Sequence, residues 1–140
     1  MATARFWREN PSRYNLKAVR CGNCGKVFFP PRAVCSVCHR KSIGKMECMN
    51  LKGEGEVYSF SVVHDAPSQF EILKPYVMAI VKMDEGVMLT SQLINVDAKK
   101  VEIGLRVRAT LRKVGEDGPA GVIYYGYKFT PVSGHMDHKD

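Results

Sequence analysis

A chain of 140 residues, of which 45% are hydrophobic and 25% charged, has the size of one domain, or of one small domain with a module attached. No apolar run approaches the roughly 20 residues of a membrane span, and residues 1–8 lack the apolar core of a secretion signal, so we expect a cytoplasmic protein without a membrane anchor. The formal net charge of +7 is uneven, because residues 1–50 contain ten Lys or Arg and two Glu, whereas residues 51–140 contain eleven Lys or Arg and twelve Asp or Glu. The basic N-terminal part suits an anionic partner. Charge alone does not decide whether that partner is nucleic acid, a phosphorylated cofactor or an acidic protein face.

Residues 1–20 predict a helical arm. Pro11 interrupts any continuous helix, but Asn10 as a cap with Pro11 at the first position would start a short second helix. The arm carries aromatic and arginine side chains, which are the usual anchors of protein interfaces. One interpretation is that the arm docks on another chain, and the alternative is that it folds back on the segment that follows. The residues predicted to dock are Phe6, Trp7, Arg13 and Tyr14.

Two Cys-x-x-Cys pairs follow the arm, separated by ten residues; their members are Cys21, Cys24, Cys35 and Cys38. Each pair can aim two thiolates at one centre, and four thiolates complete the tetrahedron of a structural zinc site. We therefore predict a rubredoxin-like zinc ribbon with its connector over residues 21–52, the connector being residues 42–52. Iron would suit the same ligands, and two unrelated disulfides or a redox pair are the alternatives. Such a site has no open position, so it should hold structure and not perform chemistry.

Residues 53–132 predict a mainly β domain. Runs of β-branched and aromatic residues indicate strands over residues 57–63, 75–83, 87–96, 105–114 and 121–130. Gly86 closes a predicted hairpin turn, and Asp97 is the predicted cap of one helical turn that ends at Lys100. Five strands with a short helix between the third and the fourth is the order of an OB-fold barrel. Residues 133–140 are predicted to be a polar tail.

The alternation of side chains predicts which strand faces are buried. Tyr58, Phe60 and Val62 are expected to share one face of the first strand. In the fourth strand the residues expected to face the core are Leu105, Val107, Ala109 and Leu111. Cys48, the fifth cysteine, is interpreted as a packed thiol, because nothing near it in sequence would activate it.

The sequence contains no combination of residues that we interpret as an active site. His64 and Asp65 are adjacent, so their side chains would point to opposite faces of a strand. Two features could instead bind ligands. Tyrosine and phenylalanine rings on the barrel could stack on bases, although the alternative is that they fill the core and line its rim. The loop between Pro67 and Pro75, with its single Phe70, could wall a narrow apolar tunnel.

Several motifs together resemble the zinc-ribbon/OB-fold family of acyl-CoA-associated proteins. In the first half of the chain they are Arg13-Tyr14-Asn15-Leu16, Cys21-x-x-Cys24-Gly25-Lys26 and Phe29-Pro30-Pro31-Arg32-x-x-Cys35-x-x-Cys38. In the barrel they include Gly55-Glu56-Val57-Tyr58-Ser59-Phe60, Pro75-Tyr76-Val77 and Tyr125-Gly126-Tyr127-Lys128-Phe129. The resemblance covers roughly residues 6–132, and it implies a helical arm, a rubredoxin-like ribbon and an OB-fold.

As a short, single-unit form of this family, the chain resembles the archaeal member that bridges acetoacetyl-CoA thiolase and 3-hydroxy-3-methylglutaryl-CoA (HMG-CoA) synthase. The resemblance implies a non-catalytic scaffold that helps to form a shared coenzyme A cleft in the mevalonate pathway of isoprenoid biosynthesis. Arg32, Phe70 and Tyr76 are the residues predicted to face coenzyme A, which would be bound jointly with the partners. The alternatives are a partner of another thiolase-like enzyme, such as one in lipid degradation, and a single-stranded nucleic-acid-binding OB-fold protein.

Overall fold

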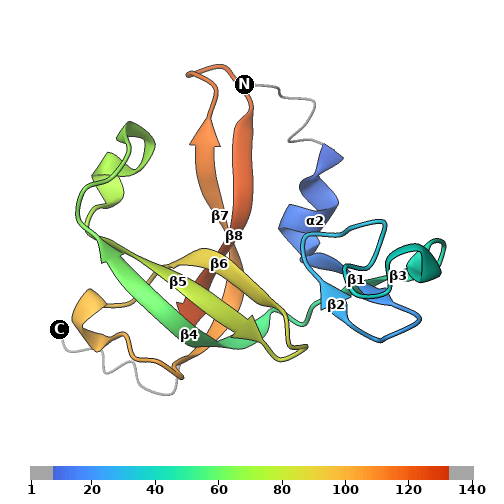
Figure 1. Ribbon diagram of the computed structural model, residues 1–140. Coiled ribbons are helices and arrows are strands. Elements are labelled where there is room, and N and C mark those ends of the chain that lie inside the picture. Colours follow the sequence, from blue (N-terminus) through green and yellow to red (C-terminus); the bar gives the residue numbers. More distant parts are fainter. Residues whose placement is uncertain (1–7, 133–140) are drawn as a thin grey trace.

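A computed structural model describes residues 8–132 and shows a small N-terminal sheet beside a closed barrel (Figure 1). Helix α2 (Asn10–Asn15) leads into the first sheet, which contains β1 (Lys17–Cys21), β2 (Val27–Phe28) and β3 (Met46–Asn50). The barrel strands are β4 (Glu54–Val63), β5 (Tyr76–Met83), β6 (Met88–Leu93), β7 (Arg106–Glu116) and β8 (Ile123–Pro131). The predicted fold class is therefore confirmed: mainly β, with a small N-terminal helix, a ribbon region and a five-stranded barrel.

The first sheet is larger than the sequence predicted. Its strand order is β2-β1-β3, and both neighbours of β1 are antiparallel to it. Residues 17–20, assigned to the helical arm, form most of β1, and the predicted connector over residues 42–52 contains β3. Helix α2 begins one residue earlier than predicted, with Glu9 at the cap position and no capping hydrogen bond from its side chain. The ribbon thus extends from Lys17 to Asn50.

The barrel has the strand order β4-β5-β6-β8-β7 and closes where β7 pairs with β4. Strands β6 and β8 meet in parallel at one pair, Leu93 and Phe129, and the other neighbours are antiparallel. The 3-10 helix η3 (Ala98–Lys100) lies between β6 and β7, and the Asp97 side chain accepts a hydrogen bond from the Lys99 amide, as the sequence predicted. Gly86 has φ +88° in the turn between β5 and β6, which confirms its predicted role.

A β-bulge in β4 changes the predicted alternation. The register shifts between Val57 and Ser59, so Tyr58 has no partner on β5 and lies 53% exposed. Beyond the bulge, Phe60 is opposite buried Ala79 and Val62 is opposite buried Val77. Val62 packs against the core, whereas Phe60 remains 36% exposed although its partner is buried. The face predicted to contain Tyr58, Phe60 and Val62 together is therefore divided.

The core fills the barrel and continues beneath the ribbon. Its largest fully buried side chains include Phe129, Met83 and Val107, and Leu16 and Leu51 join it from the ribbon side. Leu111, predicted to face in, is 46% exposed. The reason is that β7 pairs with β4 only over residues 106–108, so the later part of β7 forms a two-stranded hairpin with β8 that projects from the barrel (Figure 1). Within residues 8–132 no helix is long and apolar enough to cross a bilayer.

Candidate metal centre

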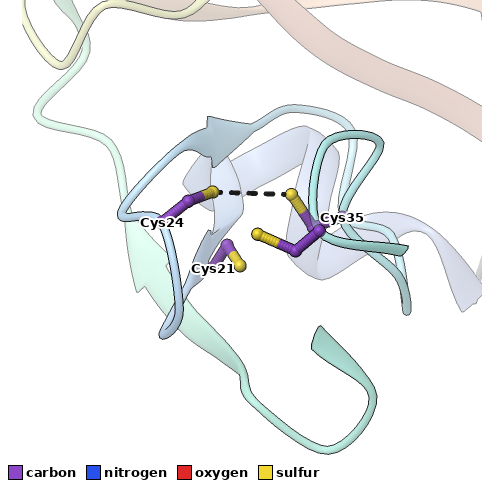
Figure 2. Close-up of side chains that lie close together, drawn as sticks. Cys21, Cys24 and Cys35 are labelled. Atoms are coloured by element: carbon purple, nitrogen blue, oxygen red, sulfur yellow. Dashed lines mark hydrogen bonds between the residues drawn. The ribbon is translucent and has the colours of Figure 1, made fainter. Parts of the chain in front are cut away.

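The four cysteines of the two predicted pairs come together at one end of the ribbon. Cys21 is the last residue of β1, Cys24 follows in the adjacent turn, and Cys35 and Cys38 lie in the turn before η1 (His39–Ser42). Their four sulfur atoms all lie within 4.8 Å of one another, and the sulfurs of Cys24 and Cys35 are 3.6 Å apart. Figure 2 shows the side chains of Cys21, Cys24 and Cys35 directed toward a common centre. The arrangement brings the predicted ligands into one cluster.

The first turn is held by backbone hydrogen bonds. The Gly25 amide donates to the Cys21 carbonyl at 2.8 Å, and the Cys21 amide donates to the Lys26 carbonyl at 2.9 Å. Gly25 has φ +76°, a left-handed conformation that glycine adopts at no steric cost. Gly22 packs so closely that a Cβ there would lie 2.8 Å from the Lys45 carbonyl oxygen. These contacts fix the direction of the first two thiols.

The second turn depends on a buried hydroxyl that the sequence did not reveal. Ser42 is completely buried; its Oγ accepts a hydrogen bond from the Cys35 amide at 2.9 Å and donates one to the His39 carbonyl at 2.6 Å. The Val37 amide points at the Cys35 sulfur, 3.4 Å away, and the Asn23 side-chain amide donates to the Cys38 sulfur at 3.1 Å. Hydrogen bonds of this kind stabilise thiolates. The only sequence signal for Asn23 is its place between Cys21 and Cys24.

The pKa values of Cys24 and Cys35 are shifted in opposite directions. At Cys24 a hydrogen bond from the Lys26 amide lowers the pKa, but desolvation and the three neighbouring thiols outweigh it and raise the value from 9.0 to about 12. At Cys35 desolvation raises the pKa, yet the amides of Cys38 and Val37 and two neighbouring sulfurs lower it to about 7. Of these two thiols Cys35 therefore ionises more readily, because neighbouring thiolates of like charge repel. A divalent cation would remove that conflict, since a coordinated thiol is deprotonated outright.

The geometry fits a structural zinc ion. Zinc–sulfur bonds of about 2.3 Å in a tetrahedron place sulfurs roughly 3.8 Å apart, close to the 3.6 Å between Cys24 and Cys35. All five cysteines lie within the described residues and none forms a disulfide, which contradicts the disulfide alternative. Cys48 is exposed on β3 and takes no part in the cluster, so its interpretation as a packed thiol is wrong.

Of the three residues predicted to face coenzyme A, Phe70 and Tyr76 lie together and Arg32 lies apart from them. The Arg32 guanidinium lies 5.0 Å from the centre of the Phe28 ring, on the ribbon. Phe70 lies in η2 (Ser68–Leu73), between β4 and β5, and its ring centre is 6.1 Å from that of Tyr76 at the start of β5. Figure 1 shows this loop and the ribbon on different sides of the barrel, so the three residues cannot form one compact site.

Two of the residues predicted to dock on a partner contact other parts of this chain. Arg13 forms an ion pair with Glu9 at 2.7 Å, and the Tyr14 ring meets the Tyr125 ring of β8 edge to face, with centres 6.4 Å apart. Tyr14 remains 40% exposed. The other two, Phe6 and Trp7, lie outside the described residues. Helix α2 is thus seated against the β7–β8 hairpin.

A cleft lies between α2, the loop at the end of β2 and the β7–β8 hairpin. It measures about 630 Å³, and Arg13, Phe29, Val114 and Tyr127 are among the residues that line it. A second hollow of about 420 Å³ shares Phe29, Pro30 and Tyr127 with the first and continues over β5 and β6. Desolvation raises the pKa of Tyr127, while the charge of Arg13 acts in the opposite direction. The sequence did not predict this cleft, because its walls come from three distant segments.

Two protein-family models match the chain, one over the ribbon and one over the barrel. Residues 8–44 match the rubredoxin-like zinc ribbon domain of ChsH2, and residues 50–112 match the C-terminal OB-fold domain of ChsH2. A solved structure described as the Ltp2-ChsH2(DUF35) aldolase contains a chain that matches with a TM-score of 0.70 and 29% identity, over 94% of this chain and 95% of that chain.

Curated relatives match over almost the whole length. A DUF35 domain-containing scaffold protein of Methanocaldococcus jannaschii is 48% identical over 91% of this chain and 89% of its own. A protein of the same description from Methanothermobacter thermautotrophicus is 46% identical over 92% of this chain and 96% of its own. The resemblance found in the sequence is confirmed. The chain belongs to the family of DUF35 domain-containing scaffold proteins, which join a ChsH2-type zinc ribbon to an OB-fold.

Proposed function

We propose that the chain is a non-catalytic scaffold subunit that links acetoacetyl-CoA thiolase to HMG-CoA synthase in the mevalonate pathway. The observation that carries the proposal is the match at 48% identity, over 91% of this chain and 89% of the relative, to a protein described as a scaffold. A match that includes ribbon, barrel and their connection supports a shared role for the whole molecule, beyond a shared fold.

The chemistry of the described residues supports a role without turnover. Between residues 8 and 132 the four-cysteine cluster is the one group of three or more metal-ligating side chains. Four thiolates fill a tetrahedral zinc ion, which leaves no position for a substrate or a reactive water. His64 and Asp65 are both exposed and share no hydrogen bond that the structure describes. We therefore assign catalysis to the partner enzymes.

Such a scaffold would act by holding the thiolase and the synthase close together. Condensation of two acetyl-CoA molecules by a thiolase is thermodynamically uphill, so prompt consumption of acetoacetyl-CoA draws the reaction forward. We propose that the cleft beside α2 forms part of a coenzyme A site that the partners complete. Phe29 and Tyr127, whose ring centres are 5.7 Å apart, would contact the pantetheine arm, and Arg13 lies in the same wall. Arg32, Phe70 and Tyr76 stay predictions for more distant parts of a shared cleft.

The test uses the full chain with its zinc and the purified thiolase and synthase from the same organism. Native mass spectrometry should detect a complex that contains all three proteins, and omission of the chain should leave the two enzymes separate. In a coupled assay the complete complex should release less free acetoacetyl-CoA than the two enzymes alone. Acetyl-CoA turnover by the isolated chain, or its failure to bind either enzyme, would contradict the proposal.

A second candidate is a scaffold for a different acyl-CoA enzyme. The observation that favours it is the likeness, at TM-score 0.70, to a chain of the Ltp2-ChsH2(DUF35) aldolase. The same native mass measurement separates the candidates when the complex is isolated from source cells and its components are identified. A single partner enzyme other than the thiolase or the synthase would establish the second candidate and exclude the first.

A further inference from the structure

The zinc ribbon carries an unusual excess of unpaired positive charge. Residues 17–50 contain seven Lys or Arg and one carboxylate, Glu47, which lies opposite Arg20 across β1 and β3. None of the seven forms an ion pair with any residue between 8 and 132. Those seven are Lys17, Arg20, Lys26, Arg32, Arg40, Lys41 and Lys45. Zinc with four thiolates has a formal charge of two minus, so a metallated ribbon remains strongly positive.

Two of these cations are held close together with no carboxylate between them. The Lys26 ammonium is 5.6 Å and the Arg32 guanidinium 5.0 Å from the centre of the same Phe28 ring. The two charges are therefore at most about 11 Å apart, close to the Debye length of about 10 Å at 0.1 M salt. Each is attracted to the ring, which partly fixes its position. Such a pair can receive an anion with little further ordering.

The second cysteine turn adds an open hollow of about 590 Å³. Its lining includes Val37, Arg40 and Lys41, and the Val37 side chain is 59% exposed. Val34 and Ile43, on either side of this turn in sequence, are also exposed, the latter to 63%. Exposed apolar side chains among unpaired cations are typical of a surface that meets protein.

The ribbon lacks the feature that favours single-stranded nucleic acid. Between residues 17 and 50 the only Phe, Tyr or Trp rings are those of Phe28 and Phe29. Phe28 is buried, and Phe29 packs against Tyr127 of the barrel. Neither ring is presented to a base, whereas sequence-tolerant strand binding uses exposed rings as stacking platforms.

We propose that the outer face of the zinc ribbon, defined by Val37, Arg40 and Lys41 around the hollow at the second cysteine turn, docks on an acidic protein face that also presents apolar side chains. The proposal rests on charge complementarity: Arg40 and Lys41, which form no ion pair within residues 8–132, would meet carboxylates of the partner, and the exposed Val37 side chain would meet an apolar one. The proposal extends the proposed function by naming the surface that meets a partner enzyme, and it rests on that function only for the identity of the partner.

The first experiment compares full-length zinc-loaded variants in binding to the purified thiolase and synthase. The double variant R40E/K41E leaves the contacts of Lys26 and Arg32 with the Phe28 ring intact. The variant R32E tests separately whether the cation at that ring contributes to binding. The control K99E/K100E reverses two exposed lysines in η3, outside the ribbon. We expect R40E/K41E to weaken binding by at least about tenfold, with a smaller salt dependence than wild type, and the control to bind as wild type. Equal zinc content of all variants verifies that the ribbon is folded. Unchanged binding by R40E/K41E would overturn the proposal.

The second experiment does not require a partner enzyme. A twelve-residue peptide of alternating glutamate and leucine is titrated into ¹⁵N-labelled protein, and a twelve-nucleotide oligothymidylate is titrated in parallel. We expect the peptide to shift the amide resonances of Val37, Arg40 and Lys41 and to leave those of η3 unchanged. Peptide shifts elsewhere, no peptide shifts, or tighter binding of the oligonucleotide would overturn the proposal. If wild type binds neither enzyme but the peptide shifts the ribbon, the proposed function fails and the acidic-face proposal stands.

Discussion

The backbone amide of Cys35 donates a hydrogen bond to the hydroxyl of Ser42 at 2.9 Å, and both residues are completely buried. This bond ties the first cysteine of the second pair to the end of η1. Because the same hydroxyl donates to the His39 carbonyl at 2.6 Å, one side chain satisfies two backbone groups of the turn that carries Cys35 and Cys38. The shape of the metal centre therefore depends on a residue that does not contact the metal.

Ser42→Ala should destabilise the zinc ribbon. The substitution leaves the buried Cys35 amide without a partner, which costs about 1–3 kcal/mol. We expect zinc to be lost at a lower chelator concentration than in wild type, measured by competition with a chromogenic chelator. Ser36→Ala is the matched control, since Ser36 is exposed and lies between Cys35 and Cys38. Equal chelator midpoints for the two variants would contradict the role assigned to Ser42.

Cys24→Ser should abolish metal binding and unfold the ribbon. Binding free energy at structural zinc sites is folding free energy, about 10–16 kcal/mol in isolated finger peptides. We expect one zinc per wild-type chain by elemental analysis, none in Cys24→Ser, and loss of dispersed ribbon amide resonances in that variant. Cys48→Ser is the control and should keep its zinc, because Cys48 lies outside the cluster. Visible absorption from bound iron would show that the native metal is iron and not zinc.

The metal ligands could be predicted from sequence because the signal is local. Within each pair the spacing alone places two thiols on one turn, and no distant residue is needed to recognise it. Ser42 could not be found in this way, since a serine near a metal turn is common and its value here comes from complete burial. The barrel was predictable for a similar reason, because strands, turns and the Asp97 cap each have signals within a few residues.

The errors arose where long-range pairing decides the structure. Strand β3 lacks a clear alternation and exists because Lys17 pairs with Asn50 and Cys21 with Met46 across the sheet. The same pairing makes residues 17–20 a strand, although they continue a segment with helical character. In β4 a bulge at Tyr58 shifts the faces, and a bulge is set by the partner strand, which the sequence of β4 alone does not reveal.

The ion pair between Asp84 and Arg106 should stabilise the barrel at neutral pH and should lose this effect in acid. The Arg106 guanidinium donates to both Asp84 oxygens, at 2.8 and 3.1 Å, and these hydrogen bonds hold the pKa of Asp84 below its ordinary 3.8. A carboxyl with a lowered folded pKa contributes stability above its unfolded value and loses it as pH falls through the folded value. Asp84→Asn should therefore unfold at lower urea than wild type near pH 7, and the difference should shrink below about pH 4.

The control for this pH series is Asp65→Asn. Asp65 is exposed and forms no ion pair within residues 8–132, so its urea midpoint should follow that of wild type across the series. A difference between Asp84→Asn and wild type that persists undiminished at pH 2–3 would assign the effect to packing and not to the ion pair.

Gly55→Ala should destabilise the barrel at the point where β4 crosses between β5 and β7. A Cβ at Gly55 would lie 2.5 Å from the Lys82 carbonyl oxygen and 3.0 Å from a Val81 methyl. The obstacle is backbone in a ladder, where Gly55 pairs with Met83 on one side and Val107 on the other, so it cannot move aside without breaking strand pairs. Overpacking of this kind costs about 1–3 kcal/mol, and we expect a lower urea midpoint with an unchanged slope. Gly115→Ala is the control, because a Cβ there meets no atom within 4 Å. If the two variants unfold at the same urea concentration, close packing at Gly55 does not limit the stability of the barrel.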